Sequence, residues 1–481
     1  MVKKFFGIIL FSCLFASFAY SQGKKNVILV IADGGGPSIM ALLMQYARYA
    51  PNSPYKDRLS NIEKIFNEGV LGIVLNDTKN TLVADSAAAA TQIASGGRTN
   101  PLSIGVDAEG KPLLNLAEQA KKLGKATGVL TDVFVLDATP VVFGAHRANR
   151  KDYDNLAKDL LDSKLDVVLG GGLNYFMSKN NLKDPKYENI LQKVPYSSTL
   201  APRAKDDEIF KQLLSSGYPL VFHKKNLAKA KGPKLFGLFA GAALPQTIDT
   251  NPKSSYPTLR EMTQKALEIL SKNENGFFLM AEAGMLDWAA HNHDQGAVLQ
   301  ELLELDDLLG YLTDWVQTHP DTLLVLTADH DTSGFAFAYH YATEEESKAN
   351  QAKEAGGYIF GGEDFVSKAN LDIIAKQKRS AYELIKDFNK LDKSKQTPQT
   401  MQKLIKDYLA YDLTLQDIEK AGSFNAAIDE VVRRLGIAWA SKYHTAAPLF
   451  VVFYGAKDGI KGGVMHNTQI NEKIMDFLNA K

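Results

Sequence analysis

Cysteine is almost missing from the sequence: Cys13 is the single cysteine among 481 residues. It lies inside a segment that we expect to be removed, so the mature chain would have no thiol and no disulfide. Residues 10–13 (Leu-Phe-Ser-Cys) loosely resemble a lipoprotein cleavage site, and cleavage before Cys13 stays an alternative. Stability in an oxidising compartment must then come from the core or from bound metal.

An excess of charge of one sign is also missing, because 55 basic side chains balance 55 acidic ones. Proteins dedicated to nucleic-acid binding usually carry a strong basic excess, so no nucleic-acid-binding patch is expected. With 45% hydrophobic and 23% charged residues, the chain is also unlike disordered proteins. No repeat, heptad array or low-complexity tract interrupts it.

The chain has one conspicuous apolar run near its start, residues 5–18, which is too short for a comfortable membrane span. Lys3 and Lys4 precede it, and residues 19–21 (Ala-Tyr-Ser) form a small-x-small cleavage site. This arrangement is typical of a secretory signal peptide, here residues 1–21. We therefore expect an exported protein, periplasmic or secreted, with no transmembrane anchor after cleavage.

The rest of the chain alternates between short apolar runs and amphipathic segments. Runs that are typical of buried strands lie at 26–32, 165–169, 234–239, 277–281, 322–328 and 449–454, with a looser run at 126–136. Segments with helical periodicity lie at 113–123, 155–162, 258–271 and 300–315. This alternation predicts an α/β fold, with a large, mainly parallel central sheet and helices on both faces.

Residues 343–439 break the alternation. They are rich in Lys, Glu, Asp, Gln and Ala, show helical periodicity and contain no convincing buried strand. We interpret them as a helical insertion or cap that projects from the sheet. A passive surface elaboration and a role in substrate access or dimerisation are both open interpretations.

Acidic residues follow four of the apolar runs. Asp33, Asp137, Glu282 and the pair Asp329-His330 all come at or near the carboxyl end of a predicted strand. Ligand sites in open α/β sheets form outside the carboxyl ends of the strands, so these side chains should converge. One such acid could simply cap a helix, but several together, with histidine nearby, favour a metal site.

The sharpest local pattern is Asp287 followed four residues later by His291. On a helix the two side chains share one face and can hold one metal ion. His444, just before the predicted strand at 449–454, adds a further imidazole. Carboxylate and imidazole together suit Zn²⁺, whereas carboxylate and hydroxyl suit Mg²⁺. The chain has enough such residues for more than one ion.

Ser86 is the candidate nucleophile, because the alanine run that follows it predicts a helix starting there. A helix N-terminus offers free N–H groups and positive charge to a phosphate. The alternative is that Ser86 or Asp85 merely caps the helix. Arg150 can bind two phosphate oxygens, although a solvated surface arginine is the simpler interpretation of this residue alone.

Taken in order, these motifs closely resemble the alkaline phosphatase family. They are Asp-Gly-x-Gly (Asp33), Asp-Ser-Ala (Ser86), Asp-Ala-Thr-Pro (Asp137, Thr139), Arg150, Glu-x4-Asp-x3-His (Glu282, Asp287, His291), Thr-Ala-Asp-His (Asp329, His330) and His-Thr (His444). The resemblance implies one catalytic domain over 22–481 with the predicted insertion inside it. It is also compatible with a homodimer.

The resemblance implies a role for each motif residue. Ser86 would attack phosphorus and carry a phosphoserine intermediate, and Arg150 would bind the phosphate oxygens. Asp287, His291 and His444 would hold one Zn²⁺. Asp33, Asp329 and His330 would hold the second Zn²⁺, together with the Ser86 oxygen. Asp33, Glu282 and Thr139 would hold one Mg²⁺, with Asp137 acting through bound water. The substrates would be phosphate monoesters, and the product inorganic phosphate.

A related phosphodiesterase or a broad-specificity phosphohydrolase is the alternative function. Arg150 favours the dianion of a monoester over a diester. The context of Ser86 disfavours a sulfatase, because alanines follow it in place of the Pro-x-Arg pattern that sulfatases need.

Overall fold

The computed structural model describes residues 24–250, 254–344, 348, 359–360 and 362–480. The predicted signal peptide, 1–21, lies outside the described residues, as do parts of the predicted insertion. Within the described residues, no helix combines the length and the apolar character needed to span a membrane.

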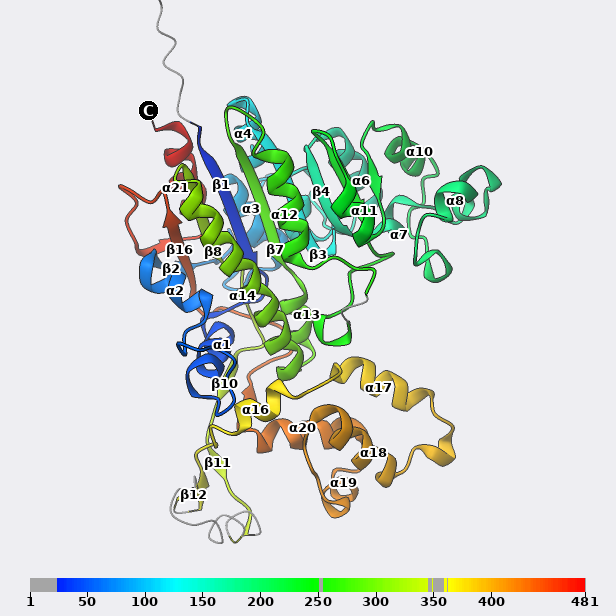
Figure 1. The fold of residues 1–481 in the computed structure, drawn as a ribbon, viewed down its shortest axis with the longest axis vertical. Coiled ribbons are helices and arrows are strands. Elements are labelled where there is room, and N and C mark those ends of the chain that lie inside the picture. The colour runs from blue at the N-terminus through cyan, green and yellow to red at the C-terminus, as the bar shows by residue number, and fades with distance from the viewer. Residues whose placement is uncertain (1–23, 251–253, 345–347, 349–358, 361, 481) are drawn as a thin grey trace, which may run out of the picture.

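A ten-stranded sheet forms the centre of the molecule, in the order β17-β2-β16-β8-β1-β7-β3-β4-β6-β5 (Figure 1). The strands are β1 (Asn26–Ala32), β2 (Val70–Leu75), β3 (Ala126–Phe134), β4 (Val167–Gly171), β5 (Leu220–Val221), β6 (Leu235–Leu238), β7 (Phe277–Ala283), β8 (Thr322–Thr327), β16 (Leu449–Gly455) and β17 (Gly463–His466). Strand β1 is buried along its whole length and pairs in parallel with β7 and β8, which explains its unbroken apolar sequence.

Strand β16 runs antiparallel to both of its neighbours, β8 and β2, while the other pairings in the sheet are parallel. The fold is thus the predicted mainly parallel α/β sheet, with one reversed strand that the apolar pattern did not reveal. The reversal matters for the site, because the start of β16 lies at the same edge as the carboxyl ends of the parallel strands.

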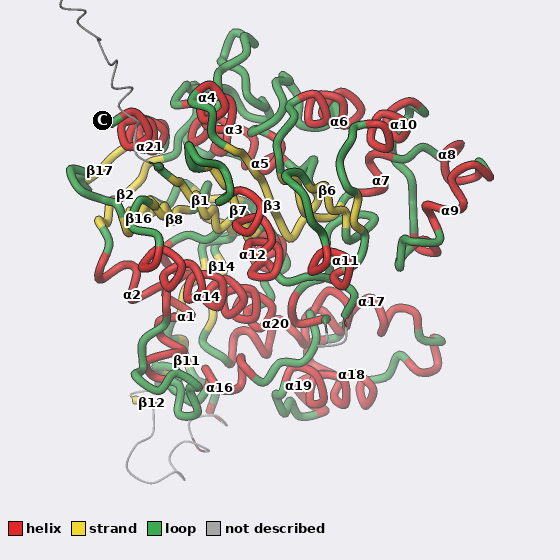
Figure 2. Tube along the Cα trace, turned by 45° about the horizontal axis from the view of Figure 1, so that its top comes forward, coloured by secondary structure: helices red, strands yellow, loops and turns green. Residues whose placement is uncertain are grey.

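Helices cover both faces of the sheet (Figure 2). One face carries α2 (Asn61–Glu68), α11 (Lys224–Lys229), α12 (Leu259–Leu270) and α14 (Gln295–Thr318); the other carries α3 (Ser86–Ser95), α4 (Leu116–Lys122), α5 (Ala138–Val141), α6 (Tyr153–Asp162) and α21 (Thr468–Asn479). Helix α12 illustrates how the sequence produces a helix that packs on the sheet. A capping box of Thr258 and Glu261 starts it, and Leu259, Met262 and Ala266 place its buried apolar face against the sheet.

Further elements surround this core. They are α1 (Pro37–Tyr49), α7 (Leu173–Phe176), α8 (Lys179–Lys183), α9 (Glu188–Leu191), α10 (Glu208–Ser215), α13 (Met285–His291), and two short strands, β9 (Asp331–Thr332) and β15 (His444–Thr445), which pair with each other. That last pairing joins the segment after β8 to the segment before β16.

The 343–439 region contributes helices below the sheet in Figure 1. They are α16 (Asn370–Ala375), α17 (Ala381–Lys390), α18 (Pro398–Leu404), α19 (Leu415–Ala421) and α20 (Phe424–Arg434). Short strands, which the sequence did not predict, flank them: β12 (Ile359–Phe360) and β13 (Glu363–Asp364) pair beside β11 (His340–Tyr341), and β14 (Ile437–Trp439) pairs with β10 (Phe335–Phe337). Strands of two or three residues are too short to produce a detectable alternation.

Candidate active site

The predicted acidic residues meet at one edge of the sheet. Asp33 directly follows β1, Glu282 is the next-to-last residue of β7, and Asp329-His330 follows β8. Register explains the convergence, since Glu282 pairs with Ile31 of β1 on one side and with a β3 residue on the other. The antiparallel direction of β16 brings His444 to the same edge.

Asp33, Asp329 and His330 form the first group of possible metal ligands, and their ligand atoms all lie within 4.8 Å of one another. His330 Nε2 is 3.3 Å from Asp33 Oδ1 and 3.2 Å from Asp329 Oδ2. All three side chains are buried. Those two carboxylate oxygens have no hydrogen-bond partner within the described part of the chain. Buried carboxylate oxygens without a hydrogen-bond partner are well suited to binding a cation.

Asp287, His291 and His444 form the second group. Asp287 and His291 are one turn apart on α13, with His291 Nε2 3.4 Å from Asp287 Oδ1. His444 Nε2 lies 3.2 Å from His291 Nε2 and 3.8 Å from the same Asp287 oxygen. The imidazole of His330 stacks on that of His444, with 3.5 Å between ring centroids. The two groups are therefore contiguous.

The partners of the ring nitrogens determine how these histidines face the cluster. His291 Nδ1 is 2.6 Å from the Lys442 carbonyl oxygen, and His444 Nδ1 is 3.0 Å from that of Ala84. A carbonyl oxygen can only accept, so both Nδ1 atoms carry the proton. In neutral rings the two Nε2 atoms are then acceptors that face each other at 3.2 Å. Acceptors cannot satisfy one another, so this geometry fits a shared cation.

Thr332 orients the third histidine in the same way. Its hydroxyl donates to Asp287 Oδ1 at 2.5 Å and lies 3.2 Å from His330 Nδ1. Because the single hydroxyl proton goes to the carboxylate, the oxygen accepts from His330 Nδ1, and His330 Nε2 also faces the cluster as an acceptor.

Oxygen-bearing side chains form a third group beside Asp33. Thr139 Oγ1 is 3.5 Å from Asp33 Oδ2, and the Thr131 hydroxyl donates to Glu282 Oε2 at 2.5 Å. Burial, followed by the nearby charge of Asp137, raises the pKa of Glu282 well above its ordinary value. A donor set made only of oxygens suits Mg²⁺.

Electrostatics agree with this view of the cluster. Burial and then the neighbouring carboxylates raise the pKa of Asp33 well above its ordinary value, and burial followed by the charge of Asp287 raises the pKa of Asp329 to about 7. Burial lowers the pKa of His330 and of His444. Ionised acids are disfavoured here for want of positive charge, which divalent cations would supply.

Ser86 is the first residue of α3, and its hydroxyl lies beside the first metal group. The helix is capped by Asp85, whose side chain accepts from the Ala88 amide at 3.1 Å. The Ser86 hydroxyl is therefore not used as the cap, and its Oγ lies 3.1 Å from His330 Nε2. At this point it faces both the positive end of the helix and the candidate metal ligands.

Arg150 bonds to Asp85, the residue before Ser86, and is not a solvated surface residue. Its Nη1 donates to Asp85 Oδ2 at 3.1 Å and its Nη2 to Asp137 Oδ1 at 2.9 Å, and its side chain is 22% exposed. Burial raises the pKa of Asp137, and the nearby guanidinium of Arg150 lowers it. The effect of burial is larger, so the pKa is raised on balance. The two carboxylates hold the guanidinium in place, and its remaining N–H groups are available to an anion.

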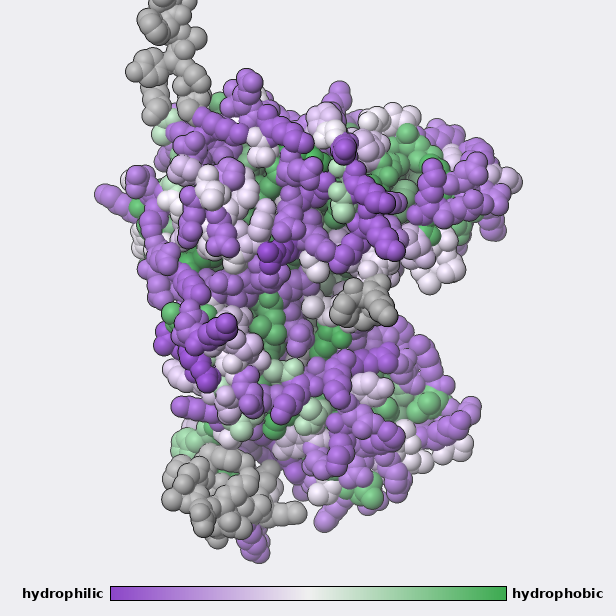
Figure 3. Space-filling model, viewed as in Figure 1, coloured by the Kyte–Doolittle hydropathy of each residue, from purple (hydrophilic) through white to green (hydrophobic). Residues whose placement is uncertain are grey.

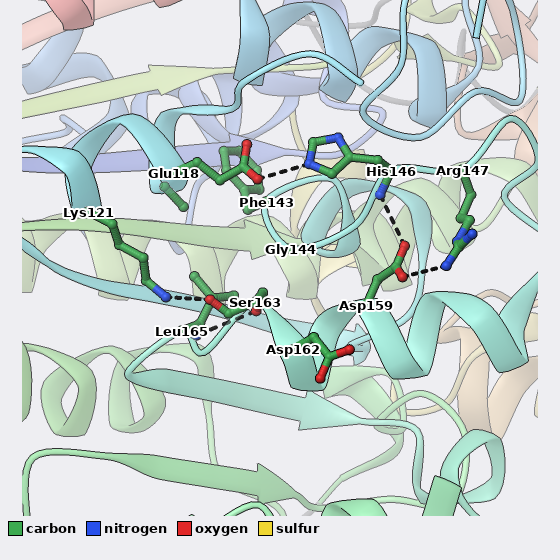
Figure 4. Close-up of a pocket in the computed structure, with 11 residues that line it drawn as sticks. Glu118, Lys121, Phe143, Gly144, His146, Arg147, Asp159, Asp162, Ser163 and Leu165 are labelled. Atoms are coloured by element: carbon green, nitrogen blue, oxygen red, sulfur yellow. Dashed lines mark hydrogen bonds and ion pairs between the residues drawn. The ribbon is translucent and has the colours of Figure 1, made fainter. Parts of the chain in front are cut away.

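Arg147, three residues earlier, points to a different pocket of about 370 Å³ (Figure 4). There it pairs with Asp159 at 2.5 Å, next to a His146–Glu118 pair at 2.9 Å. Arg147 therefore takes no part in the cluster around Ser86, which makes it a suitable control for Arg150.

Gly34 is needed for the close approach of the cluster residues. Its φ is +70°, and a Cβ at this position would lie 2.8 Å from Thr332 Oγ1 and 3.0 Å from Asp287 Oδ1. Its amide also donates to Asp329 Oδ1 at 3.2 Å. A side chain here would be strained and would collide with two of the residues that shape the site.

The sequence indicated Asp85 as a possible cap of the Ser86 helix, which the structure confirms, but it did not reveal the bond from Arg150 to Asp85 or the supporting roles of Thr131 and Thr332. Asp85 joins the Ser86 helix to Arg150, which is 65 residues away in the chain, and no local pattern indicates such a tie. Thr332 does have a signal, because it follows closely after Asp329-His330 and a hydroxyl next to metal ligands commonly orients them. The structure brings together every residue that the motifs singled out.

Comparison with known proteins agrees with the motifs. The alkaline phosphatase family model matches residues 24–480. Alkaline phosphatase 4 of Bacillus subtilis is 33% identical over 65% of this chain, and the match spans 62% of that relative, less than two thirds of its length. Alkaline phosphatase 3 of the same species is 28% identical over 94% of this chain and 89% of that relative. The crystal structure of a cold-active alkaline phosphatase from Shewanella sp. is 26% identical, covers 94% of this chain and 99% of that chain, and has a TM-score of 0.74.

Proposed function

This chain belongs to the alkaline phosphatase family, and we propose that it hydrolyses phosphate monoesters through a phosphoserine intermediate on Ser86. The observation that carries the proposal is the Ser86 hydroxyl, which lies at the start of α3, 3.1 Å from His330 Nε2 in a cluster of buried metal-ligand side chains. A serine hydroxyl is a poor nucleophile by itself and needs such a setting to react at neutral pH.

We propose three cation sites, because the donor sets fit the ions that the family resemblance implies. Asp287, His291 and His444 would hold one Zn²⁺, and Asp33, Asp329 and His330 the other. Asp33, Glu282 and Thr139 would hold Mg²⁺, with Asp137 acting through water. Zinc, when bound, supplies Lewis acidity that lowers the pKa of a nearby hydroxyl and stabilises charge on entering and leaving oxygens.

The protein's own groups then account for the reaction. Ser86 Oγ gives up its proton to solvent and attacks phosphorus, so that a P–O bond to Ser86 forms. The P–O bond to the alcohol breaks on the opposite side, and the alcohol oxygen takes up a proton. Arg150 and the N-terminal amides of α3 bind the non-bridging oxygens and stabilise their charge. Water next attacks the phosphoserine, which releases inorganic phosphate and restores the hydroxyl of Ser86.

Two variants of α3 test the proposal. Ser86→Ala should lower kcat for p-nitrophenyl phosphate by several orders of magnitude while bound zinc, measured by elemental analysis, stays largely in place. Ser95→Ala is the control, because Ser95 ends the same helix and its hydroxyl makes only local bonds among the described residues, to the Thr91 carbonyl and from the Gly97 amide. Wild-type activity in Ser86→Ala would refute the nucleophile assignment.

We also propose that the chain is exported and cleaved after residue 21, and that the mature enzyme can form a homodimer. N-terminal sequencing of the protein recovered from outside the cytoplasm should begin at Gln22. A start at Cys13 would instead support the lipoprotein alternative. Light scattering of the mature protein tests the dimer.

A further inference from the structure

Helix α13 is only seven residues long, yet it carries two of the proposed metal ligands, Asp287 and His291. So short a helix is not stable by itself, because most of its backbone N–H and C=O groups have no partner within it. One of its faces, formed by Met285, Trp288 and Asn292, lines a groove of about 930 Å³ and is not packed against the insertion. Figure 1 shows α13 between the sheet and α17, and Figure 3 shows the surface hollowed between these two parts of the molecule. The contacts at the two ends of α13 therefore become important for its position.

The start of α13 is capped by a residue from a strand of the sheet. Gly284, at the N-cap position, has no side chain that could accept from the first free amides of the helix. Asp132, near the end of β3, takes this role. Its Oδ1 accepts from the Gly284 amide at 2.7 Å and from the Met285 amide at 3.0 Å. Asp132 is buried, so little water competes for these amides, and the first turn of α13 is bound to the central sheet.

The end of α13 is held by a second buried carboxylate, Asp294. Its amide donates to the Ala289 carbonyl at 3.1 Å, which joins it to the last turn of α13. Its side chain caps α14 through the Ala297 amide at 3.0 Å. The same side chain accepts from the Gln377 amide group at 2.7 Å and from the Ala381 backbone amide at 2.5 Å. Gln377 and Ala381 belong to the insertion, so the insertion is bound to the end of α13.

The contact between Asp294 and the insertion is closely packed. The Gln377 amide nitrogen also donates to the Arg379 carbonyl at 2.9 Å, so both of its N–H groups are used and its orientation is fixed. Gly296, in the first turn of α14, leaves just enough space for it, because a Cβ there would lie 2.1 Å from Gln377 Oε1. Asp294 therefore has a rigid partner on the insertion.

Only one of the two groups of possible zinc ligands depends on α13. Asp287 and His291 lie on the helix and face His444, whose Nε2 is 3.2 Å from His291 Nε2. The other group has no member on the helix: Asp33, Asp329 and His330. A displacement of α13 at either end would change the positions of Asp287 and His291 relative to His444 and leave the other group in place.

We propose that Asp132 and Asp294 are positioning residues, which hold the two ends of α13 and so place Asp287 and His291 for one metal ion. The inference rests on the proposed function, because it concerns the support of one of the zinc sites proposed there. It also gives the insertion a part in building that site, through Gln377 and Ala381. Loss of the groups that support metal ligands lowers metal affinity by about ten- to a hundredfold.

The zinc affinity of each site in the full-length mature enzyme tests this inference. Zinc retained against increasing chelator concentration, measured by elemental analysis, should show two ions in wild type. In Asp132→Ala and Asp294→Ala one ion should bind at least about tenfold more weakly. The other should stay within twofold of wild type. Asp132→Asn should restore wild-type affinity, because its amide oxygen can accept from both amides in place of Oδ1.

Gln377→Ala tests the part of the insertion without removing the cap of α14. It should weaken the same ion as Asp294→Ala, and by a smaller factor, because Asp294 keeps its bonds to Ala297 and Ala381. An affinity equal to that of wild type for both ions would exclude the insertion from the site.

Asp306→Ala is the matched control. Asp306 is another buried aspartate of α14, about 18 Å along the helix from Asp294. It accepts from the Ile62 amide and from the Tyr55 hydroxyl, both at 2.8 Å, and so supports a different part of the fold. Its removal should lower the melting temperature, as in Asp132→Ala and Asp294→Ala, but leave both zinc affinities unchanged.

Cobalt in place of zinc adds a readout that general destabilisation does not change, since its visible absorption reports the geometry of its ligands. The spectrum should change in Asp132→Ala and Asp294→Ala and stay the same in Asp132→Asn and Asp306→Ala. Equal loss of both zinc ions in Asp132→Ala and Asp294→Ala, or unchanged affinity in both, would overturn the inference. Circular dichroism checks that each variant is folded.

Activity of the wild type separates this inference from the proposed function. If wild type hydrolyses no monoester but its two zinc affinities respond to the variants as described, the proposed function fails and the positioning roles stand. If wild type hydrolyses monoesters and holds two zinc ions that the variants do not distinguish, the positioning roles are overturned alone. A wild type that binds neither zinc nor cobalt would overturn both.

Discussion

Replacing Arg150 with alanine should weaken the binding of inorganic phosphate by about a hundredfold. A bidentate guanidinium contact to a dianion contributes about 1.5–3 kcal/mol, which corresponds to about ten- to a hundredfold in affinity. The structure indicates that the loss of phosphate affinity lies at the upper end of this range. Arg150 neutralises Asp85 and Asp137, so its removal would leave two unpaired carboxylates next to the bound phosphate.

The assay is the inhibition constant of phosphate, measured against p-nitrophenyl phosphate. Arg150→Lys should fall between wild type and alanine, because lysine keeps the charge but lacks the fork that binds two oxygens. Arg147→Ala is the matched control and should match wild type, since Arg147 pairs with Asp159 in a separate pocket.

The same variant tests the choice between monoesters and diesters. The terminal oxygens of a monoester carry two charges and those of a diester one, so Arg150→Ala should narrow the ratio of kcat/KM between p-nitrophenyl phosphate and bis-p-nitrophenyl phosphate. An unchanged ratio together with an inhibition constant within twofold of wild type would refute the reasoning and leave Arg150 only a structural role, as the partner of Asp85 and Asp137.

Three further predictions concern metal, backbone and pH. Chelation should lower the melting temperature, because ions that bind only the folded state stabilise it, and identical melting curves for the stripped and zinc-loaded enzyme would count against bound metal. Gly34→Ala should reduce bound zinc and activity far more than Gly110→Ala, which has the same backbone strain (φ +82°) but open space around it; equal loss in both would exclude the collision with Thr332. Hydrogen bonds from Arg433 and Arg434 lower the pKa of Glu430 to about 2, below its ordinary value of 4.5. This stabilisation is present above pH 4.5 and is lost as the pH falls toward 2, so the melting temperature of wild type should drop more between pH 5 and 3 than that of Glu430→Gln, and parallel curves would contradict it.

The strands that could be predicted are those buried on both faces. Residues 26–32 form β1 with the predicted bounds, because a central parallel strand must be apolar throughout. Strand β2 was not predicted, although its residues are apolar. Its structure alternates, with Leu71, Ile73 and Leu75 exposed and Gly72 and Val74 buried, and this alternation does not show in a sequence without polar residues. The direction of β16 depends on its partners β2 and β8, which its own residues do not specify.

The candidate site likewise has features that the sequence predicts and features that it does not. Strand-end acids and the Asp287–His291 spacing are local features, and the amino-acid sequence alone is enough to indicate a metal cluster from them. The ties that organise it are not local: Asp85 reaches Arg150 across 65 residues, and His444 bonds the Ala84 carbonyl across 360. Such contacts depend on how strands pack and not on any pattern within a segment. The identity of the ions and the role of the 343–439 insertion stay predictions.

The central claim is that Ser86 carries the phosphoryl group during turnover. Enzyme mixed with a labelled monoester and quenched in acid should retain about one phosphate per active site, and peptide mapping should place it on Ser86, with no label in Ser86→Ala. Label on another residue, or none in an enzyme that turns over normally, would contradict the account.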